Sequence, residues 1–463
     1  MRCNCNQDTL TDRIIFHIDV NSAFLSWTAV QRLGRGDTLD IRTVPSVVSG
    51  DPEDRRSIVT AKSIPAKKYG INTAEPVSMA LRKCPKLIVV GGDWEWYKKC
   101  SEAFIAICRT YSPVLQQFSI DECFIDMTGR TDVKHAVDVA NRLREEIRTR
   151  LGFTVNVGVG SNKLLAKMAS DFEKPDKVHT LWPSEIEEKM WPLPAGDLLW
   201  VGKKSAEKLT AYGIKTIGQL AAAPENVMLR IFGPKGAKST HDSANGIDNS
   251  PVSTEEEEAK SYSAERTFSS DISDSDQLDR QLFNVACIVT HRIRRDHFAA
   301  SNVSVFVKTK DFVSRSKQHT MTFPTDVTAV ILNEARRLIP EVWDGVTPLR
   351  QVGLGVSRLT HDMPLTLFED ENMEYYRQWD AEYDRKMLEQ EKKDRHYRDG
   401  RSKVLKFSYA TGEQALRAAK NSVKEGNGCA FERNPLPDGT DCFEVRDADG
   451  NVTELHMIVK TLL

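Results

Sequence analysis

Three acidic residues, widely separated in the chain, have the types and surroundings needed to hold metal ions. Asp19 ends the apolar run Ile14–Ile18, and the adjacent pair Asp121 and Glu122 follows the apolar approach 114–118. Carboxylates at strand ends can bind two divalent cations ~3.5–4 Å apart, the arrangement used to displace pyrophosphate or to open a phosphodiester. Mg²⁺ suits such a site because it takes carboxylate oxygens and shares substrate phosphates. Since about a hundred residues separate the acids, only a folded domain can bring them together.

Each motif is weak by itself, because an Asp or an Asp-Glu pair after an apolar run is often a turn, a cap or a solvated strand end. The neighbouring residues strengthen both. Asp19 begins the segment DVNSAF, residues 119–126 predict a hairpin strand, and GVGSNKLLAKMAS at 158–170 is followed by Lys174-Pro175. Together and in this order, the motifs resemble the signature of the Y-family DNA polymerases, the DinB/UmuC-type translesion enzymes, over roughly residues 10–360.

The resemblance implies an α+β multidomain fold with a ferredoxin-like polymerase palm, small fingers, a helical thumb containing a helix-hairpin-helix, an α/β little finger and a C-terminal appendix. The order strand, helix, hairpin, helix, strand is the split βαβ pattern of such a palm. The charged helix expected over 371–398 is interpreted as solvated. The expected boundaries are 1–22 and 93–180 for the palm, 23–92 for the fingers, 181–247 for the thumb, 248–260 for a linker, 261–362 for the little finger, 363–369 for a clamp-binding peptide, and 370–463 for the charged helix and a small β-rich appendix of unknown role.

The same resemblance implies roles for the site residues. Asp19, Asp121 and Glu122 would be the catalytic metal ligands, with the backbone carbonyl of Val20 as a further ligand. Two Mg²⁺ ions, for which Mn²⁺ can substitute, would activate the primer 3′-hydroxyl and stabilise the leaving pyrophosphate. Phe24 stands where the family places its steric gate, a ring that excludes a ribose 2′-hydroxyl; the alternative is a core residue of the first helix. Nucleotide contacts are expected from Val20, Asn21, Ser22, Ala23, Lys67 and Lys174.

The chain departs from the DinB pattern at several of these positions. Ile64 stands where that pattern has a Tyr, and Lys67 where it has an Arg. Replacing the planar guanidinium with an ammonium removes a bidentate contact to phosphate. Asn21 and Ala23 stand where many relatives carry an Asp and an aromatic residue, and these differences resemble the UmuC side of the family.

Two regions are expected to bind DNA. Residues 199–220 resemble a helix-hairpin-helix, whose turn presents backbone N–H groups and lysines to a phosphate; Trp200 stands where relatives usually carry Gly, and a plain helical hairpin is the alternative. Residues 261–361 resemble the little finger, which contacts the DNA backbone without sequence preference; solvated strand faces are the alternative for its single basic residues. The expected contacts are Gly202, Lys203, Lys204, Lys308, Lys310, Arg315 and Arg350.

Residues 364–368, PLTLF, resemble the Gln-Leu-x-Leu-Phe peptide by which bacterial polymerases dock on the sliding clamp, although the Gln is missing. Leu365, Leu367 and Phe368 would fill an apolar pocket on the clamp. The alternative is an exposed apolar stretch without a partner. The expected partners are therefore primer–template DNA, a deoxynucleoside triphosphate and the sliding clamp, bound by a monomer.

Bulk composition is that of an ordinary soluble protein, with 64 basic and 66 acidic residues. This balance does not indicate a nucleic-acid partner, but acidic stretches at 255–258 and 369–384 can offset a basic face around Lys308–Lys317. The nine cysteines include no CxxC pair and lack partners at zinc spacing, which favours reduced cytosolic thiols. No apolar run approaches the ~18 residues of a membrane span, and the N-terminus has no apolar signal core. A cytoplasmic protein without a membrane partner is expected.

These inferences converge on a DNA-directed DNA polymerase, a nucleotidyltransferase, that performs low-fidelity translesion synthesis in DNA repair and SOS-type damage tolerance. One alternative is a non-catalytic Y-family homologue that acts as a scaffold between clamp and polymerase. Such proteins typically lose the acids that this chain keeps. A second alternative is a nucleotidyl cyclase, whose core shares the ferredoxin-like palm, but the helix-hairpin-helix and little finger resemblances disfavour it.

Overall fold

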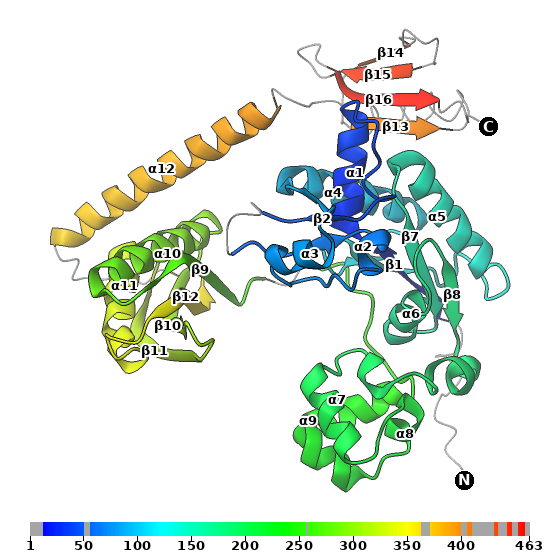
Figure 1. The fold of residues 1–463 in the computed structure, drawn as a ribbon, viewed down its shortest axis with the longest axis horizontal. Helices are drawn as coiled ribbons and strands as arrows, with labels where there is room; N and C mark the ends of the chain where they lie inside the picture. The colour runs from blue at the N-terminus through cyan, green and yellow to red at the C-terminus, as the bar shows by residue number, and fades with distance from the viewer. Residues whose placement is uncertain are drawn as a thin grey trace. The chain divides into compact units, whose positions relative to one another are not determined.

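The computed structural model describes residues 13–50, 56–255, 258–362 and 371–399, and strands at 405–409, 430–433, 442–446 and 452–458. The chain forms two compact units, both built from helices and strands (Figure 1). The first unit contains residues 1–51, 58–256 and 403–463, and the second contains 52–57 and 257–402. The boundary at 256–257 falls inside the linker expected at 248–260. The fold is therefore the α+β multidomain type predicted from the sequence.

A five-stranded sheet organises the first unit. Its strands are, in spatial order, β5 (Leu115–Gln117), β6 (Glu122–Asp126), β1 (Ile15–Val20), β7 (Val155–Gly160) and β8 (Val178–Leu181). The first four are antiparallel, and β8 runs parallel to β7. Strand β1 is central and buried on both faces, which explains its nearly continuous apolar sequence.

Alternate residues of β1 face two different helical layers. Phe16 and Ile18 pack with α4 (Trp94–Tyr111) and α5 (Ala136–Leu151) in the main core. Ile15 lies on the opposite face, in a smaller cluster with Ala166 of α6 (Lys163–Ser170). Because side chains alternate along a strand, His17 and Asp19 share the α6 face with Ile15.

Helix α6 approaches β7 so closely that two positions of the strand must be glycine. A Cβ on Gly158 would lie 1.9 Å from the Ala166 carbonyl oxygen and 2.4 Å from the Ser170 nitrogen. A Cβ on Gly160 would lie 2.8 Å from the Ala166 nitrogen. These are backbone atoms, so a side chain at either position would displace the helix. The glycines of the GVGSNK segment therefore set the height of α6 above the sheet.

Gly158→Ala is expected to lower the free energy of unfolding by about 1–3 kcal/mol, because the added methyl group overpacks this contact. Denaturant unfolding followed by circular dichroism measures the change. Gly91→Ala is a matched control, since a Cβ at Gly91 meets no atom within 4 Å. Equal stability of the two variants would show that α6 can shift at no cost.

Two smaller regions of the first unit lie beside this sheet in the sequence, one on each side of residues 93–180. Residues 23–92 contain α1 (Ala23–Gly34), a three-stranded sheet and two short helices; residues 182–247 are helical, with α9 broken at Gly233. Each region has its own buried core, around Val47 and around Leu209. The further elements are β2 (Ser46–Val48), β3 (Ala61–Lys62), α2 (Ile64–Lys67), α3 (Val77–Lys83), β4 (Ile88–Val90), α7 (Lys203–Ala211), α8 (Ile217–Ala221) and α9 (Glu225–Ala244).

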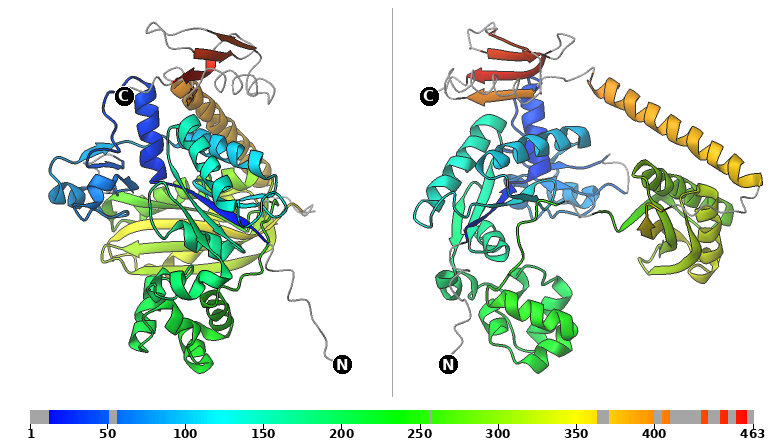
Figure 2. Two further views of the ribbon diagram at one scale, coloured as in Figure 1. Left: turned by 90° about the vertical axis from the view of Figure 1, so that its right-hand side faces the viewer. Right: turned by 180° about the vertical axis from the view of Figure 1, so that it is seen from behind.

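The second unit is an antiparallel sheet with two helices on one face (Figure 2). Its strands are, in order, β11 (Ser314–Thr325), β10 (Ala299–Thr309), β12 (Leu349–Thr360) and β9 (Ser261–Ile272), covered by α10 (Ser275–Arg295) and α11 (Thr328–Leu338). Val303, Val305 and Leu354 point toward these helices. The residues that alternate with them, such as Ser304 and Gly355, form an open polar face.

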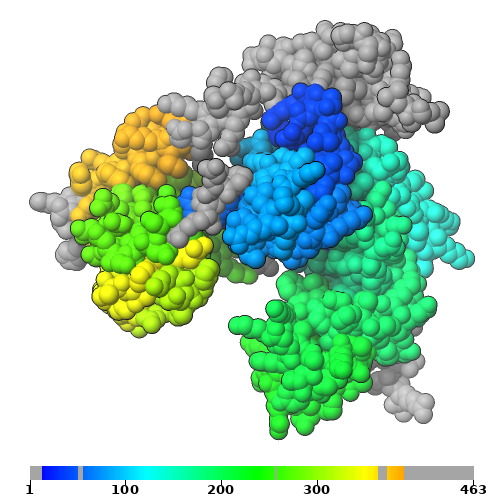
Figure 3. Space-filling model, viewed as in Figure 1, coloured from blue at the N-terminus to red at the C-terminus, as the bar shows by residue number. Residues whose placement is uncertain are grey.

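Helix α12 (Glu371–Asp399) is anchored to the second unit through its first half, where its side chains cover the surface of that unit (Figure 3). Asp380 is only 3% exposed. Its carboxylate accepts hydrogen bonds from the backbone N–H of Thr328 (3.0 Å) and from the Thr328 hydroxyl, and so caps α11 from another helix. Arg294 donates to both oxygens of Asp384, at 2.7 and 2.8 Å. The interpretation of this helix as solvated therefore fails at Asp380 and Asp384, which pair with the second unit, whereas most other described side chains of its first half are exposed.

Four strands at the end of the chain form a sheet, as the short apolar runs and Gly/Asp turns of this region predict. Their order is β13 (Leu405–Tyr409), β16 (Val452–Ile458), β15 (Cys442–Arg446) and β14 (Ala430–Arg433). Among the helices that the structure describes, none combines the length and the apolar character required to cross a membrane.

Five cysteine side chains are described by the structure, and all are free and buried: Cys84, Cys100, Cys108, Cys123 and Cys287. Burial raises the pKa of Cys100 and of Cys108. The pKa of Cys287 is raised to about 12, mainly by burial and secondly by the negative charge of Asp380. The thiols of Cys100, Cys108 and Cys287 are therefore protonated and unreactive in the folded protein.

Candidate active site

The pairing of β1 with β6 brings the three predicted acids together. Asp19 is the direct partner of Glu122 in this antiparallel pair. Asp121 precedes Glu122, and its carbonyl accepts the N–H of Val20 at 2.9 Å. Paired residues in an antiparallel sheet lie on the same face and close together. The carboxylates predicted from positions about a hundred residues apart thus form one cluster.

Two lysines form ion pairs with carboxylates of this cluster. Lys174 Nζ lies 2.7 Å from Asp19 Oδ2, and Lys167 Nζ donates to Glu122 Oε2. Among the described residues, no group of three or more His, Cys, Asp or Glu side chains is placed to hold a metal ion as the side chains stand. Cations nevertheless lie against two of the three carboxylates. A set of carboxylate donors that attracts positive charge fits a hard divalent cation such as Mg²⁺.

The surroundings shift the pKa values of the two adjacent acids in opposite directions. Burial raises the pKa of Asp121, and the charges of Asp19 and Glu122 raise it further; its own hydrogen bond comes from the neutral Ser119, at 2.6 Å. Burial would also raise the pKa of Glu122, but hydrogen bonds from His17 and Lys167 outweigh it and lower the pKa to about 2. Glu122 is therefore held as a carboxylate, whereas charge on Asp121 would gain more from a bound cation.

His17 supports Glu122 and was not assigned a role from the sequence. Its ring is fully buried, with Nε2 3.0 Å from Glu122 Oε2 and Nδ1 2.8 Å from Ser170 Oγ. Burial lowers the pKa of His17, so the ring is neutral. Because an ionised carboxylate can only accept, His17 donates from Nε2. The sequence did contain an indication of this role. His17 is two residues before Asp19 in the same strand, so the two side chains must lie on one face of the sheet.

His17→Leu is expected to reduce kcat of primer extension about 10–100-fold, because Glu122 loses the donor that fixes its orientation. The KM for the incoming nucleotide should change much less, since His17 is buried behind the carboxylate. His17→Gln keeps a donor at this position and should recover part of the rate. An unchanged kcat in a folded His17→Leu protein would contradict the positioning role.

Phe24 lies in the first turn of α1, which follows Ser22 in a left-handed conformation (φ 48°). The Phe24 ring stacks on Tyr97, with centroids 4.8 Å apart and planes inclined by 24°. The Tyr97 hydroxyl lies 2.7 Å from that of Thr28, which donates to the Phe24 carbonyl. The half-buried Phe24 ring therefore packs at the edge of the main core, and its contact with Tyr97 fixes its orientation.

The other residues predicted to contact a nucleotide have varied surroundings. Lys174 joins the carboxylates, whereas Lys67 is exposed on α2. The Asn21 side chain is buried; its oxygen accepts from the Thr154 hydroxyl (3.0 Å) and the backbone N–H of Asp176 (2.9 Å). This side chain braces the loop that carries Lys174. Val20 ends β1, Ser22 lies in the two-residue turn that follows, and Ala23 begins α1.

Gly202, Lys203 and Lys204 surround the start of α7 and are exposed, with Gly202 as the N-cap residue. Two residues earlier, Trp200 has φ +73°, in the left-handed region that favours glycine. The backbone here thus has a glycine-like conformation, although the residue is Trp.

The basic residues predicted in the second unit do not share one face. Lys308 pairs with Ser314 and Gln351 on the open face of the sheet, whereas Arg315 pairs with Val307, which is buried beneath the helices. The Arg350 guanidinium lies 4.9 Å from the centre of the Phe312 ring. Lys310 is exposed in the turn between β10 and β11. Leu365, Leu367 and Phe368, the predicted clamp-binding residues, lie outside the described residues.

Comparisons with known proteins show the family to which this chain is similar. The impB/mucB/samB family profile matches residues 18–171, and the profile of the C-terminal domain of that family matches 259–367. The chain is 42% identical to DNA polymerase IV of Clostridium acetobutylicum over 347 residues, 75% of this chain and 87% of the relative. It is 35% identical to DNA polymerase IV 1 of Bacillus subtilis, over 74% of this chain and 81% of that protein.

A solved Y-family DNA polymerase chimera has a similar fold, with a TM-score of 0.66 at 20% identity, over 75% of this chain and all of the chimera. The class that fold and site define is that of the DNA-directed DNA polymerases. Within that class the chain belongs to the Y family, in its DinB-type branch.

Proposed function

We propose that the chain performs low-fidelity translesion synthesis by two-metal-ion nucleotidyl transfer, extending a primer on template DNA with deoxynucleoside triphosphates. The observation that carries the proposal is the register of β1 and β6, which sets Asp19 against Glu122 and beside Asp121. Damage tolerance and the SOS response are the setting we propose for this activity. The relatives named DNA polymerase IV support a template-directed reaction.

The four polymerase subdomains are assigned as follows. The sheet order β5-β6-β1-β7, with α4 and α5 on one face, is that of a split βαβ unit and supports a ferredoxin-like palm formed by 1–22 and 93–180. Residues 23–92 are the fingers and 181–247 the thumb. The sheet and two helices of 261–362 are the little finger, on which the first half of α12 is anchored.

Asp19, Asp121, Glu122 and the Val20 carbonyl are the groups that would hold two Mg²⁺ ions, with Mn²⁺ as a substitute. When bound, the ions supply Lewis-acid charge that lowers the pKa of the primer hydroxyl and stabilises pyrophosphate. His17 and Lys167 hold Glu122 in place. We assign Lys174, which pairs with Asp19 and with Asp171, to the triphosphate, and the exposed Lys67 adds a second positive charge. The fixed Phe24 ring excludes a 2′-hydroxyl.

DNA binding is assigned to backbone and charge contacts. At the start of α7, Gly202 leaves N–H groups open to a phosphate, and Lys203 and Lys204 add charge. In the little finger, Lys308 and the small polar residues of the open sheet face suit a sugar–phosphate backbone. Lys310, Arg315 and Arg350 lie around one end of that sheet. We assign a monomer to this activity.

Primer extension in Mg²⁺ or Mn²⁺, on intact templates and on templates with an abasic site, tests the proposal against its rivals. Extension past the abasic site is the expected result. A folded protein that binds primer–template DNA but extends neither template would be a scaffold. Formation of a cyclic nucleotide from a triphosphate without DNA would indicate a cyclase, which the match to the family C-terminal domain disfavours.

Deleting residues 364–368 is expected to abolish stimulation by the sliding clamp and to leave distributive extension unchanged. Leu367 and Phe368 are the proposed anchors, because apolar residues that fill pockets dominate such contacts. Pull-down with purified clamp compares the intact protein with a Leu367→Ala/Phe368→Ala double variant. Equal clamp binding by both would place any clamp contact elsewhere.

A further inference from the structure

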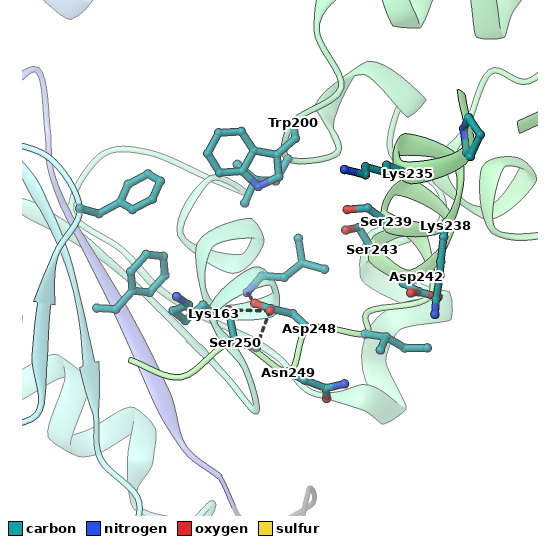
Figure 4. Close-up of a pocket in the computed structure, with 16 residues that line it drawn as sticks. Lys163, Trp200, Lys235, Lys238, Ser239, Asp242, Ser243, Asp248, Asn249 and Ser250 are labelled. Atoms are coloured by element: carbon teal, nitrogen blue, oxygen red, sulfur yellow. Dashed lines mark hydrogen bonds between the residues drawn. The ribbon is translucent and has the colours of Figure 1, made fainter. Parts of the chain in front are cut away.

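A cleft of about 730 Å³ lies in the first unit (Figure 4). Phe118 and Phe124 of the β5–β6 hairpin line it together with Trp200 from the loop before α7. Lys235 and Lys238 line it from α9, with the hydroxyls of Ser239 and Ser243 nearby. The cleft thus combines aromatic rings on one side with positive charge and hydroxyl groups on the other, and its volume is typical of a small-molecule site.

Trp200 has two energetically unfavourable features. Its φ of +73° is rare for a residue with a bulky side chain. Its side chain is also 77% exposed, although its ring meets the edge of Phe118 at a centroid distance of 6.2 Å. A strained conformation that displays a large aromatic ring is typical of a ligand contact.

The aromatic pair is connected to the carboxylate cluster. Lys167, which donates to Glu122, has its Nζ 5.6 Å from the centre of the Phe118 ring. Trp200, Phe118, Lys167 and Glu122 therefore form a continuous series of contacts. A ligand stacked on Trp200 would therefore be linked through Phe118 and Lys167 to Glu122, one of the carboxylates that the proposed function assigns to metal binding.

The charges of the cleft suit a phosphate. Lys163 donates to Gln116 at 3.1 Å at the hairpin end of the cleft, and Lys235 and Lys238 line the other wall. The acids of the cleft are Asp242 and Asp248. Asp248 is already bound, because it accepts from the backbone N–H groups of Leu164 (3.1 Å) and Ser250 (2.9 Å).

We propose that this cleft binds one unpaired deoxynucleotide, the frayed 3′-terminal nucleotide of a mismatched primer, with its base on Trp200 and its phosphate at Lys235 and Lys238. The inference rests on the proposed polymerase function. An aromatic ring stacks on any base, which suits a site that must accept every mismatch. A correctly paired base is covered by its neighbours in the duplex and cannot enter. The cleft would therefore hold a mispaired terminus away from the catalytic acids.

The test uses primer–templates with 2-aminopurine at one of three positions: a paired primer terminus, a mismatched primer terminus, or the single-stranded template overhang. Stacking on Trp200 should quench only the mismatched terminus when the protein binds, and Trp200→Gly should abolish this quenching. Trp200→Gly also removes the strain, so it should fold at least as well as the parent. Trp200→Phe retains a ring and should retain part of the quenching.

Affinity provides a second measurement. The ratio of the Kd for a mismatched primer to the Kd for a matched one should rise about tenfold in Trp200→Gly, the effect of losing one stacked base. The ratio should stay constant in Tyr212→Ala, which removes another exposed ring of the same helical region. A Lys235→Gln/Lys238→Gln double variant should raise the ratio as well.

Equal quenching in the parent and in Trp200→Gly, or an unchanged Kd ratio, would overturn the proposal. Quenching of the template probe alone would overturn the assignment to the primer. Binding and fluorescence need no catalysis, so these outcomes stay separate from the polymerase proposal, which would fail only if the parent protein did not extend a matched primer.

Discussion

Asp121→Asn and Glu122→Gln are each expected to reduce primer extension by about a thousandfold or more, with primer–template affinity changed only a few-fold. A metal ion contributes several kcal/mol of charge stabilisation to such a transfer, and each 1.36 kcal/mol corresponds to about tenfold in rate. DNA affinity should change little because it depends mainly on phosphate contacts elsewhere. Both substitutions keep the shape of the side chain and remove its charge.

Single-turnover incorporation with saturating nucleotide measures the effect, and binding of labelled primer–template DNA supplies the affinity. Asp132→Asn is a matched control, since this carboxylate is exposed and bonded to His135 outside the cluster. Full extension activity in either site variant would remove the two-metal assignment. A parallel loss of DNA affinity would instead indicate that the acids organise the DNA-binding surface.

Phe24→Ala is expected to admit ribonucleotides, with the preference for dNTP over rNTP reduced about a hundredfold. The Phe24 ring is half-buried and stacked on Tyr97, so it cannot swing away from a 2′-hydroxyl without losing that contact. Truncation to Ala leaves space for the hydroxyl and retains Tyr97 beneath it.

The measurement is the ratio of incorporation efficiencies for the two nucleotides opposite the same template base. Phe24→Tyr, which keeps the ring, should preserve the preference. An unchanged ratio in Phe24→Ala would leave Phe24 as a core residue of α1 and place sugar discrimination elsewhere. A melting curve shows whether the variant remains folded, because Phe24 also packs against Trp27.

The carboxylate cluster could be predicted because its motifs are local and because, taken together, they resemble those of a known family. Asp19 and the pair Asp121 and Glu122 each end or begin an apolar strand, and strand ends of one sheet meet. The partners of Glu122 could not be assigned in the same way. Lys167 reaches it only because Gly158 lets α6 settle onto β7, and this close approach is a tertiary event that no local pattern reports.

The boundary of the second unit was predicted less well than its fold. The alternating strands and amphipathic helices of 261–361 carry periodic signals, but α12 is highly charged over its length. Composition cannot distinguish an Asp in water from an Asp that caps another helix. Asp380 was therefore interpreted as solvated. Its partner Thr328 lies 52 residues earlier in the chain, so no local pattern around Asp380 indicates the contact. Trp200 is a similar case. Its positive φ angle could not be inferred from the residue type, because Trp normally avoids the left-handed region.

The anchoring of α12 gives the second unit a built-in chemical reporter. Cys287 is buried and protonated beside Asp380, so a maleimide can reach it only when this part of the unit opens. The rate of its alkylation, read by mass spectrometry, measures how often that opening occurs. Cys100 and Cys108 report on the first unit in the same sample. One labelling time course thus yields local opening free energies for both halves of the chain without any engineered probe.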